Sequence, residues 1–100
     1  MELELEEMEA AADRASKLMK TLGHRDRLMI LCQLAEEEKS VGEIAEQLGI
    51  RQSPLSQHLA RMRNEGLVKT RRESQTIYYS LANSDVTKVI EVLYDIYCHS

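Results

Sequence analysis

The feature that most constrains the fold of this chain is a change of hydrophobic period near its middle. Across about residues 41–65, apolar side chains recur at helical spacing in two runs separated by Gly49. Across about residues 67–81 they alternate with polar ones, as they do in β-strands. Two helices joined by a tight turn and followed by a hairpin are the parts of a winged helix-turn-helix. The sequence therefore predicts a small DNA-binding fold, with the hairpin as its wing.

Short signals mark the ends of these two helices. Ser40 and Glu43 match the capping box that begins a helix, and Gly49 is placed to end it. Pro54 falls in the first turn of the second helix, where its missing N–H costs no hydrogen bond. The side chains of the second helix that are predicted to face the core are Leu55, Leu59 and Met62.

Further helices are predicted on both sides of this unit, over about residues 4–22, 24–37 and 84–98. The expected fold class is mostly α with a small β-hairpin (α+β), in the order α-α-α-α-β-β-α. Residues 36–39 are expected to be a solvated helix end and loop. The length predicts that residues 1–100 form a single domain. A monomer this small buries a modest fraction of its surface, so an oligomer is expected.

The charge of the chain is unevenly distributed, and the net value of −4 conceals this. Residues 1–49 hold 12 acidic and 6 basic side chains, whereas residues 50–80 hold 6 basic and 2 acidic ones. A basic stretch of this kind suggests a local site for a polyanion. No apolar run is long enough for a membrane helix, and two cysteines are too few for a secreted disulfide scaffold. We therefore expect a cytoplasmic protein whose thiols are normally reduced.

The second helix of the unit and the wing carry the candidate DNA contacts. Gln can pair with adenine in the major groove, Ser can serve either base type, and Arg can hold phosphates. Arg71 and Arg72 are placed at the tip of the wing, within reach of the DNA backbone or the minor groove. An ordinary amphipathic helix would also have a polar outer face, so the prediction rests on the combination of features. The candidate DNA-binding residues are Gln52, Ser53, Ser56, Gln57, His58 and Arg61 on the helix and Arg71, Arg72 and Gln75 on the wing.

The stretch SVGEIAEQLGIRQSPLSQHLARMRNEGLVKTRRESQTIYYSL, residues 40–81, closely resembles the core of the ArsR/SmtB family of bacterial repressors. The resemblance implies a homodimeric winged helix that blocks transcription at a pseudo-palindromic operator and leaves when an inducer binds. It also implies that the first and last helices form the dimer interface. The apolar stripe of residues 86–97 agrees with this, because a small monomer rarely leaves so much apolar surface bare.

Two cysteines stand where one subgroup of that family, the sulfide-responsive SqrR- and BigR-like repressors, has its sensor thiols. Cys32 lies in LMILCQL and Cys98 in VLYDIYCHS. The resemblance implies that persulfide or polysulfide links the two thiols and that the link releases operator DNA. The residues alone leave another possibility open, because Cys32 shares a helical face with Leu28 and Leu31. A free cysteine on such a face is often a small buried hydrophobe.

Other members of the family sense metals, through Cys-x-Cys on the third helix or through ligands on the last helix. This chain has Val41-Gly42-Glu43 at the first position, and its last helix offers Asp85, Asp95 and His99 without a convergent pair. The three histidines are dispersed along the chain, at His24, His58 and His99. We therefore predict no metal site.

Three alternatives to sulfur sensing remain. The same fold can sense peroxide through a simple Cys32–Cys98 disulfide, or sense a metal, or serve only as a protein–protein interaction module. An enzyme has little support, since the sequence contains no Gly-rich phosphate loop, paired-carboxylate site or nucleophile with an evident base. We expect no catalysis and no permanent cofactor. The expected partners are double-stranded operator DNA, a second copy of the chain and a small sulfane-sulfur inducer, with no membrane.

Overall fold

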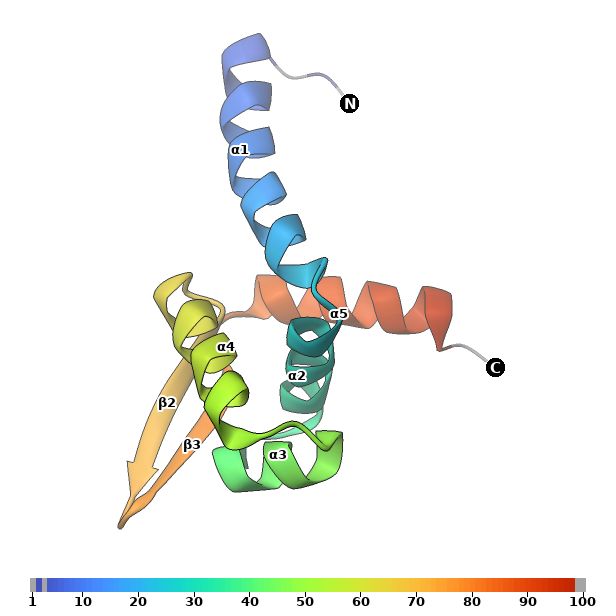
Figure 1. Ribbon diagram of the computed structural model, residues 1–100. Helices are drawn as coiled ribbons and strands as arrows, with labels where there is room; N and C mark the ends of the chain where they lie inside the picture. The colour runs from blue at the N-terminus through green and yellow to red at the C-terminus, as the bar shows by residue number, and fades with distance from the viewer. Residues whose placement is uncertain (1, 3, 99–100) are drawn as a thin grey trace.

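The computed structural model describes residue 2 and residues 4–98. Within these residues it contains α1 (Leu5–Leu22), α2 (Arg25–Glu36), β1 (Lys39–Ser40), α3 (Val41–Leu48), α4 (Gln52–Asn64), β2 (Val68–Glu73), β3 (Thr76–Leu81) and α5 (Ser84–Tyr97). Figure 1 shows α2, α3 and α4 gathered in one body, with the β2–β3 hairpin projecting from it and α1 extending away. The expected fold class, a mostly helical winged helix-turn-helix with a small sheet, is confirmed.

The core forms where α2, α3 and α4 meet. Its fully buried side chains include the three that were predicted to face inward from α4, and α5 contributes two further residues that are almost completely buried. The hydrophobic period of α4 therefore located its buried side correctly. The residues of this core are Ile30, Leu31, Leu34, Ile44, Leu55, Leu59, Met62, Leu67, Val68, Val86 and Ile90.

A third strand, β1, was not predicted. It is two residues long and pairs antiparallel with β3, with Lys39 opposite Tyr79 and Ser40 opposite Tyr78. The sheet order is β1-β3-β2, so the wing is joined to the residues that lead into α3. A strand this short has no alternating period that a sequence could display.

The side chain of Lys39 is buried, with 3% of its surface exposed, which contradicts the prediction of a solvated loop over residues 36–39. Its Nζ donates hydrogen bonds to Oε1 of Gln33 at 2.5 Å and to Oε1 of Gln47 at 3.0 Å. The same ammonium lies 3.6 Å from a carboxylate oxygen of Glu36. One cation thus joins α2, α3 and the sheet, and these contacts compensate for its loss of water.

The corner between α1 and α2 is held by a second polar group. Arg27, which is 8% exposed, donates from Nε to the carbonyl oxygen of Thr21 at 3.1 Å. Thr21 is fully buried, and its hydroxyl donates to Oε1 of Glu65, just beyond α4, at 2.6 Å. The end of α1 is therefore fixed to both α2 and the C-terminal end of α4.

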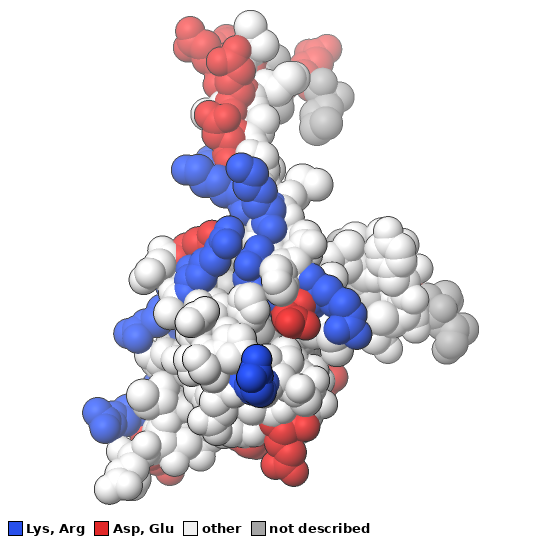
Figure 2. All heavy atoms as spheres, in the orientation of Figure 1, with Lys and Arg blue, Asp and Glu red and all other residues white. Residues whose placement is uncertain are grey.

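Charge is distributed unevenly over the molecule, as Figure 2 shows for one face. On this face, acidic side chains gather at the outer end of α1, while basic side chains lie over the part of α1 nearest the body. A pocket of about 570 Å³ opens beside that basic part, and α1 brings Arg14, Lys17 and Lys20 into it together with Arg61 of α4. The sequence had indicated positive charge only in residues 50–80, because the basic residues of α1 are outweighed by its acids.

Helices α1 and α5 leave several large apolar side chains in solvent. Tyr97, the most exposed of them, has 78% of its surface free. No helix in the described part of the chain is long and apolar enough to span a bilayer. The exposed apolar residues of these two helices are Leu5, Met8 and Met19 on α1 and Val92, Tyr94, Ile96 and Tyr97 on α5.

Replacement of Lys39 by alanine is expected to destabilise the fold by about 1–3 kcal/mol, because it removes the donor shared by Gln33 and Gln47. Urea unfolding at matched protein concentration measures this change. Lys88→Ala on the exposed side of α5 is the control, and its effect should stay within about 0.5 kcal/mol. Equal effects of the two substitutions would show that Lys39 is not a structural link.

Candidate DNA interface and thiol pocket

The outer face of α4 carries most of the predicted DNA contacts. The turn before α4 is set by Gly49, which ends α3 in the left-handed region at φ 66°. The first turn of α4 has no side-chain cap, since its N-cap residue Arg51 makes no such hydrogen bond. The backbone N–H groups of Gln52 and Ser53 thus receive no side-chain cap and are available to bind a phosphate. Five of the six predicted helix contacts are exposed and lie opposite the buried side of α4: Gln52, Ser53, Ser56, Gln57 and Arg61.

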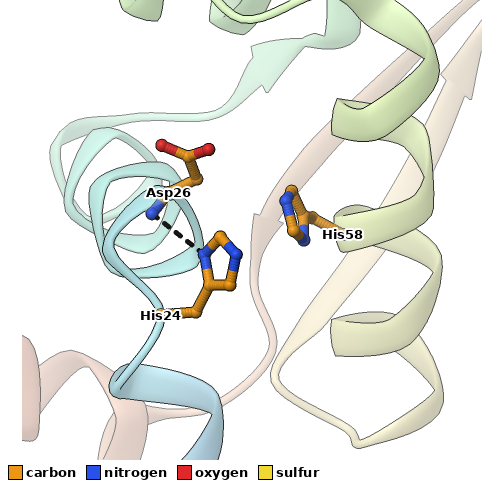
Figure 3. Close-up of side chains that lie close together, drawn as sticks. All are labelled: His24, Asp26 and His58. Carbon is orange, nitrogen blue, oxygen red and sulfur yellow. Dashed lines mark hydrogen bonds between the residues drawn. The ribbon is translucent and has the colours of Figure 1, made fainter.

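His58 differs from the other five predicted helix contacts, which are exposed. It is half-buried and faces His24, and the centroids of the two rings are 4.7 Å apart with a tilt of 58° (Figure 3). His24 is the N-cap of α2, and its Nδ1 accepts a hydrogen bond from the backbone N–H of Asp26 at 3.2 Å. Burial lowers the pKa of His58, and the nearby charges of His24 and Arg27 lower it further.

The expectation that the histidines are dispersed is therefore wrong for two of them. His24 and His58 converge from distant positions of the chain, and Asp26 lies beside them. His99, the third histidine, lies outside the described residues. No local pattern in the sequence signals this meeting, because it depends on the angle at which the α1–α2 corner approaches α4.

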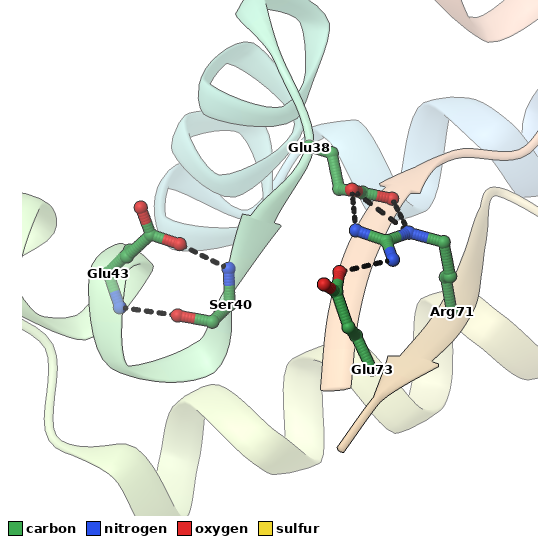
Figure 4. Close-up of polar contacts among 5 residues, drawn as sticks. All are labelled: Glu38, Ser40, Glu43, Arg71 and Glu73. Atoms are coloured by element: carbon green, nitrogen blue, oxygen red, sulfur yellow. Dashed lines mark hydrogen bonds and ion pairs between the residues drawn. The ribbon is translucent and has the colours of Figure 1, made fainter. Parts of the chain in front are cut away.

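The capping box predicted at the start of α3 is present. The backbone N–H of Glu43 donates to the hydroxyl of Ser40 at 3.2 Å, and the Glu43 carboxylate accepts from the backbone N–H of Ser40 at 2.9 Å (Figure 4). The second of these bonds lowers the pKa of Glu43 because it stabilises the carboxylate. The start of α3 is thereby fixed beside β1.

Arg71 is not at the tip of the wing, in contrast to the prediction. It lies opposite Tyr78 in the sheet and stacks on that ring, with 4.8 Å between Cζ and the ring centroid. Its guanidinium donates to Glu38 at 2.6 Å and to Glu73 at 2.7 Å (Figure 4). These carboxylates raise the pKa of Arg71, and Arg71 lowers the pKa of Glu38. The charge of Arg71 is therefore compensated within the protein.

Arg72 and Gln75 occupy the end of the wing. Arg72 pairs with Ile77 next to the last pair of the hairpin, and its only hydrogen bond in the described residues runs from Nε to the carbonyl oxygen of Ser74 at 3.3 Å. Gln75 lies in the exposed turn. A basic side chain with no carboxylate partner is better suited to a phosphate than Arg71 is, so we expect Arg72 to be the wing contact.

The two cysteines, far apart in sequence, line a single pocket of about 630 Å³ between α2 and α5. Cys32 lies on α2 and Cys98 is the C-cap of α5, and both are free and exposed thiols. The exposure of Cys32 contradicts the alternative in which it is merely a small buried hydrophobe, because its neighbour Leu31 occupies the core instead. The other walls are mostly apolar or aromatic and include Leu28, Ala35, Ile90, Leu93, Tyr94 and Tyr97.

The electrostatic character of this pocket is negative. Glu36, Glu91 and Asp95 lie in its lining, and the described lining residues include no Lys or Arg. The pocket walls remove part of the hydration of Cys32 and so raise the pKa of its thiol, and Cys98 and Glu36 raise it further. Since the thiolate is the reactive form, the pocket restrains the nucleophilicity of Cys32.

The chain is similar in sequence to known regulatory proteins. Residues 24–70 match the family described as bacterial regulatory protein, arsR family. The transcriptional activator HlyU of Vibrio cholerae is 45% identical over 98% of this chain and 91% of its own length. The biofilm growth-associated repressor of Agrobacterium fabrum is 47% identical over 97% of this chain and 83% of its own length.

The chain is also similar to a solved structure of a regulatory protein. The crystal structure of the transcriptional repressor BigR from Xylella fastidiosa superposes with a TM-score of 0.87 at 42% identity, and the match covers 98% of this chain and 100% of that one. These similar proteins are named as regulators of transcription, one as an activator and two as repressors. This agrees with the prediction that the chain is not an enzyme.

Replacement of Arg72 by alanine is expected to weaken DNA binding and to flatten its salt dependence. The slope of log K against log salt should change by about 0.9 for each phosphate that the protein no longer neutralises. Arg71→Ala is the matched control, since its charge already faces Glu38 and Glu73, and its slope should be unchanged. Fluorescence anisotropy with a random-sequence duplex at several salt concentrations measures both slopes. A flatter slope for Arg71→Ala alone would contradict the assignment.

The alkylation rate of Cys32 by iodoacetamide should rise with pH around a midpoint above that of an ordinary cysteine. In a Cys98→Ser background the rate reports Cys32 alone. Because the negative charge of Glu36 disfavours the thiolate, Glu36→Gln should lower the midpoint and speed the reaction at neutral pH. Glu37→Gln, outside the pocket, is the control. An unchanged midpoint in Glu36→Gln would mean that the pocket charge does not act on Cys32.

Proposed function

Because this chain belongs to the ArsR family of bacterial regulatory proteins, we propose that it is a homodimeric repressor that senses reactive sulfur through Cys32 and Cys98. With both thiols free it binds operator DNA in the cytoplasm. A sulfur bridge between the two cysteines then releases the operator. The observation that carries the proposal is the single pocket in which α2 and α5 bring these two thiols together.

The chemistry of the bridge follows from thiol–polysulfide exchange. The thiolate of one cysteine attacks the central sulfur of an organic trisulfide, and one thiolate of the reagent leaves. The second cysteine attacks the same transferred sulfur, and the other thiolate of the reagent leaves. The product is Cys–S–S–S–Cys, and the trisulfide is the oxidant that has been reduced to two thiols. The extra atom lengthens the bridge beyond the reach of a direct disulfide, which requires Cα atoms within about 7 Å.

The charge of the pocket favours an uncharged form of the inducer. Glu36, Glu91 and Asp95 repel anions such as inorganic polysulfide, and no described basic residue of the lining offsets them. An organic trisulfide, or a protonated persulfide, avoids this repulsion. The apolar and aromatic walls offer such a molecule the kind of surface that small-ligand sites usually have.

The dimer is supported by the exposed apolar surface. Helices α1 and α5 both present large apolar side chains to solvent, among them Met19 at 69% and Ile96 at 63% exposure. We interpret these side chains as an interaction surface, because soluble monomers rarely leave large apolar patches exposed. A second copy of the chain is the partner we propose, with α1 and α5 of each protomer in the interface.

A connection between the pocket and the DNA surface is provided by α2. Cys32 lies on α2, and the same helix carries Gln33 and Glu36, which contact Lys39. Lys39 in turn is bonded to α3 through Gln47 and to the wing through β1. A bridge that ties α2 to the end of α5 thus acts on the element that positions the two α4 helices of the dimer. Operator half-sites require a separation of about 34–36 Å, so a small rotation weakens binding.

One experiment tests this proposal. A sample is divided into portions that are reduced, treated with glutathione trisulfide, or treated with hydrogen peroxide. DNA affinity and intact mass are measured for each. We expect that only the trisulfide weakens binding, with a mass gain of one sulfur atom and a loss of two hydrogens per chain. Cys32→Ser and Cys98→Ser should each keep DNA affinity and abolish this response.

Each other outcome identifies a different function. Release by peroxide with a loss of two hydrogens and no added sulfur would assign the protein to peroxide sensing through a simple disulfide. Unchanged binding in every portion would remove both cysteines from the mechanism. An absence of salt-dependent DNA affinity in the reduced protein would instead favour an interaction module that does not bind DNA.

A further inference from the structure

A cluster of three potential metal ligands lies away from the thiol pocket, where α2 begins and α4 passes beside it. His24 and Asp26 come from the start of α2, and His58 comes from α4 (Figure 3). Each offers one ligand atom, and these atoms all lie within 4.8 Å of one another. We propose that His24, Asp26 and His58 form a binding site for a divalent first-row transition ion such as Zn²⁺.

The donor set selects the class of ion. Two imidazole nitrogens and one carboxylate oxygen suit Zn²⁺, Co²⁺ and related ions, whereas Mg²⁺ and Ca²⁺ prefer oxygen ligands throughout. His24 is exposed and the other two residues are half-buried, so water can complete the coordination. Metal–nitrogen and metal–oxygen bonds of about 2.0–2.2 Å require ligand atoms closer together than 4.8 Å, so the side chains turn slightly inward on binding.

The two halves of the site are held in place by contacts that do not involve its ligands. Arg27 fixes the α1–α2 corner through its hydrogen bond to the Thr21 carbonyl, and Thr21 joins that corner to Glu65 beyond α4. His24 follows directly after this corner, and His58 lies on the helix that ends just before Glu65. The site therefore does not need α2 and α4 to be brought together by the ion.

An ion that binds His24 displaces the hydrogen bond that caps α2. Its Nδ1 accepts the capping hydrogen bond from Asp26, so the proton of the neutral ring is on Nε2. An ion bound at Nε2 requires that this proton move to Nδ1, and an ion bound at Nδ1 occupies the accepting lone pair directly. In both cases the capping hydrogen bond is replaced by a metal–nitrogen bond, and the backbone N–H of Asp26 turns to solvent.

The site is independent of the proposed sulfur chemistry, since it shares no residue with the thiol pocket. It does share α4 with the candidate DNA contacts, and His58 directly follows Gln57. An ion there would connect the helix that contacts DNA to the start of α2. The role of the ion is to stabilise this connection between α4 and the start of α2. The proposed sulfur bridge between Cys32 and Cys98 acts separately, toward the other end of α2.

The test uses the full chain with both cysteines replaced by serine, because thiolates would otherwise compete for the ion. Co²⁺ is titrated and its visible absorption bands are followed, and Zn²⁺ is used to displace it. We expect one ion per chain. Loss of a residue that only supports a metal ligand lowers metal affinity by about tenfold or more. His58→Gln removes a ligand itself and should therefore lower Co²⁺ affinity by more than about tenfold. Asp26→Asn should lower it by less than His58→Gln. His99→Gln is the matched control and should bind as before.

A second measurement does not depend on a substitution. Zn²⁺ is added to the same protein, and the ring nitrogen resonances of the histidines are observed by NMR. The proposal requires that His24 and His58 both shift and that the shift saturates at one equivalent. It is overturned if these two rings are unaffected, if His99→Gln abolishes binding, or if His58→Gln binds Co²⁺ as tightly as the parent.

Discussion

The burial of Lys39 is the constraint on which the arrangement of this small fold depends. Its ammonium is surrounded by two glutamine oxygens and a carboxylate that come from α2 and α3, and its backbone is part of the sheet. A buried cation must keep such partners, since removing it from water without them is unfavourable. The helix that bears Cys32, the helix-turn-helix and the wing therefore keep fixed positions relative to one another.

Those parts of the fold that depend on neighbouring residues were predictable from the sequence. The Ser40–Glu43 capping box spans one helical turn, and the inward positions Leu55, Leu59 and Met62 follow the helical period. Both signals are local, and each survives in the folded protein because the tertiary structure agrees with it.

The parts that were not predicted all depend on residues that meet from distant positions. Lys39 follows three glutamates and looks like a loop residue until β3 pairs with it. Arg71 meets Glu38 across 33 positions, and this ion pair was not visible in the sequence. His58 of α4 faces His24 at the start of α2, and the α1–α2 corner beside them is attached to Glu65. The shared pocket of Cys32 and Cys98 was expected only from a family resemblance, since spacing carries no information about it.

The outer face of α4 and the thiol pocket have no residue in common. A substitution on α4 can therefore alter which DNA sequence is preferred without disturbing the chemistry between α2 and α5, and a substitution in the pocket can do the reverse. Proteins that descend from one ancestral chain can therefore change the inducer they respond to and the operator they bind independently of each other. Mutational drift in such a lineage is restricted chiefly at the shared scaffold between the two surfaces, where a change at Lys39 affects both at once.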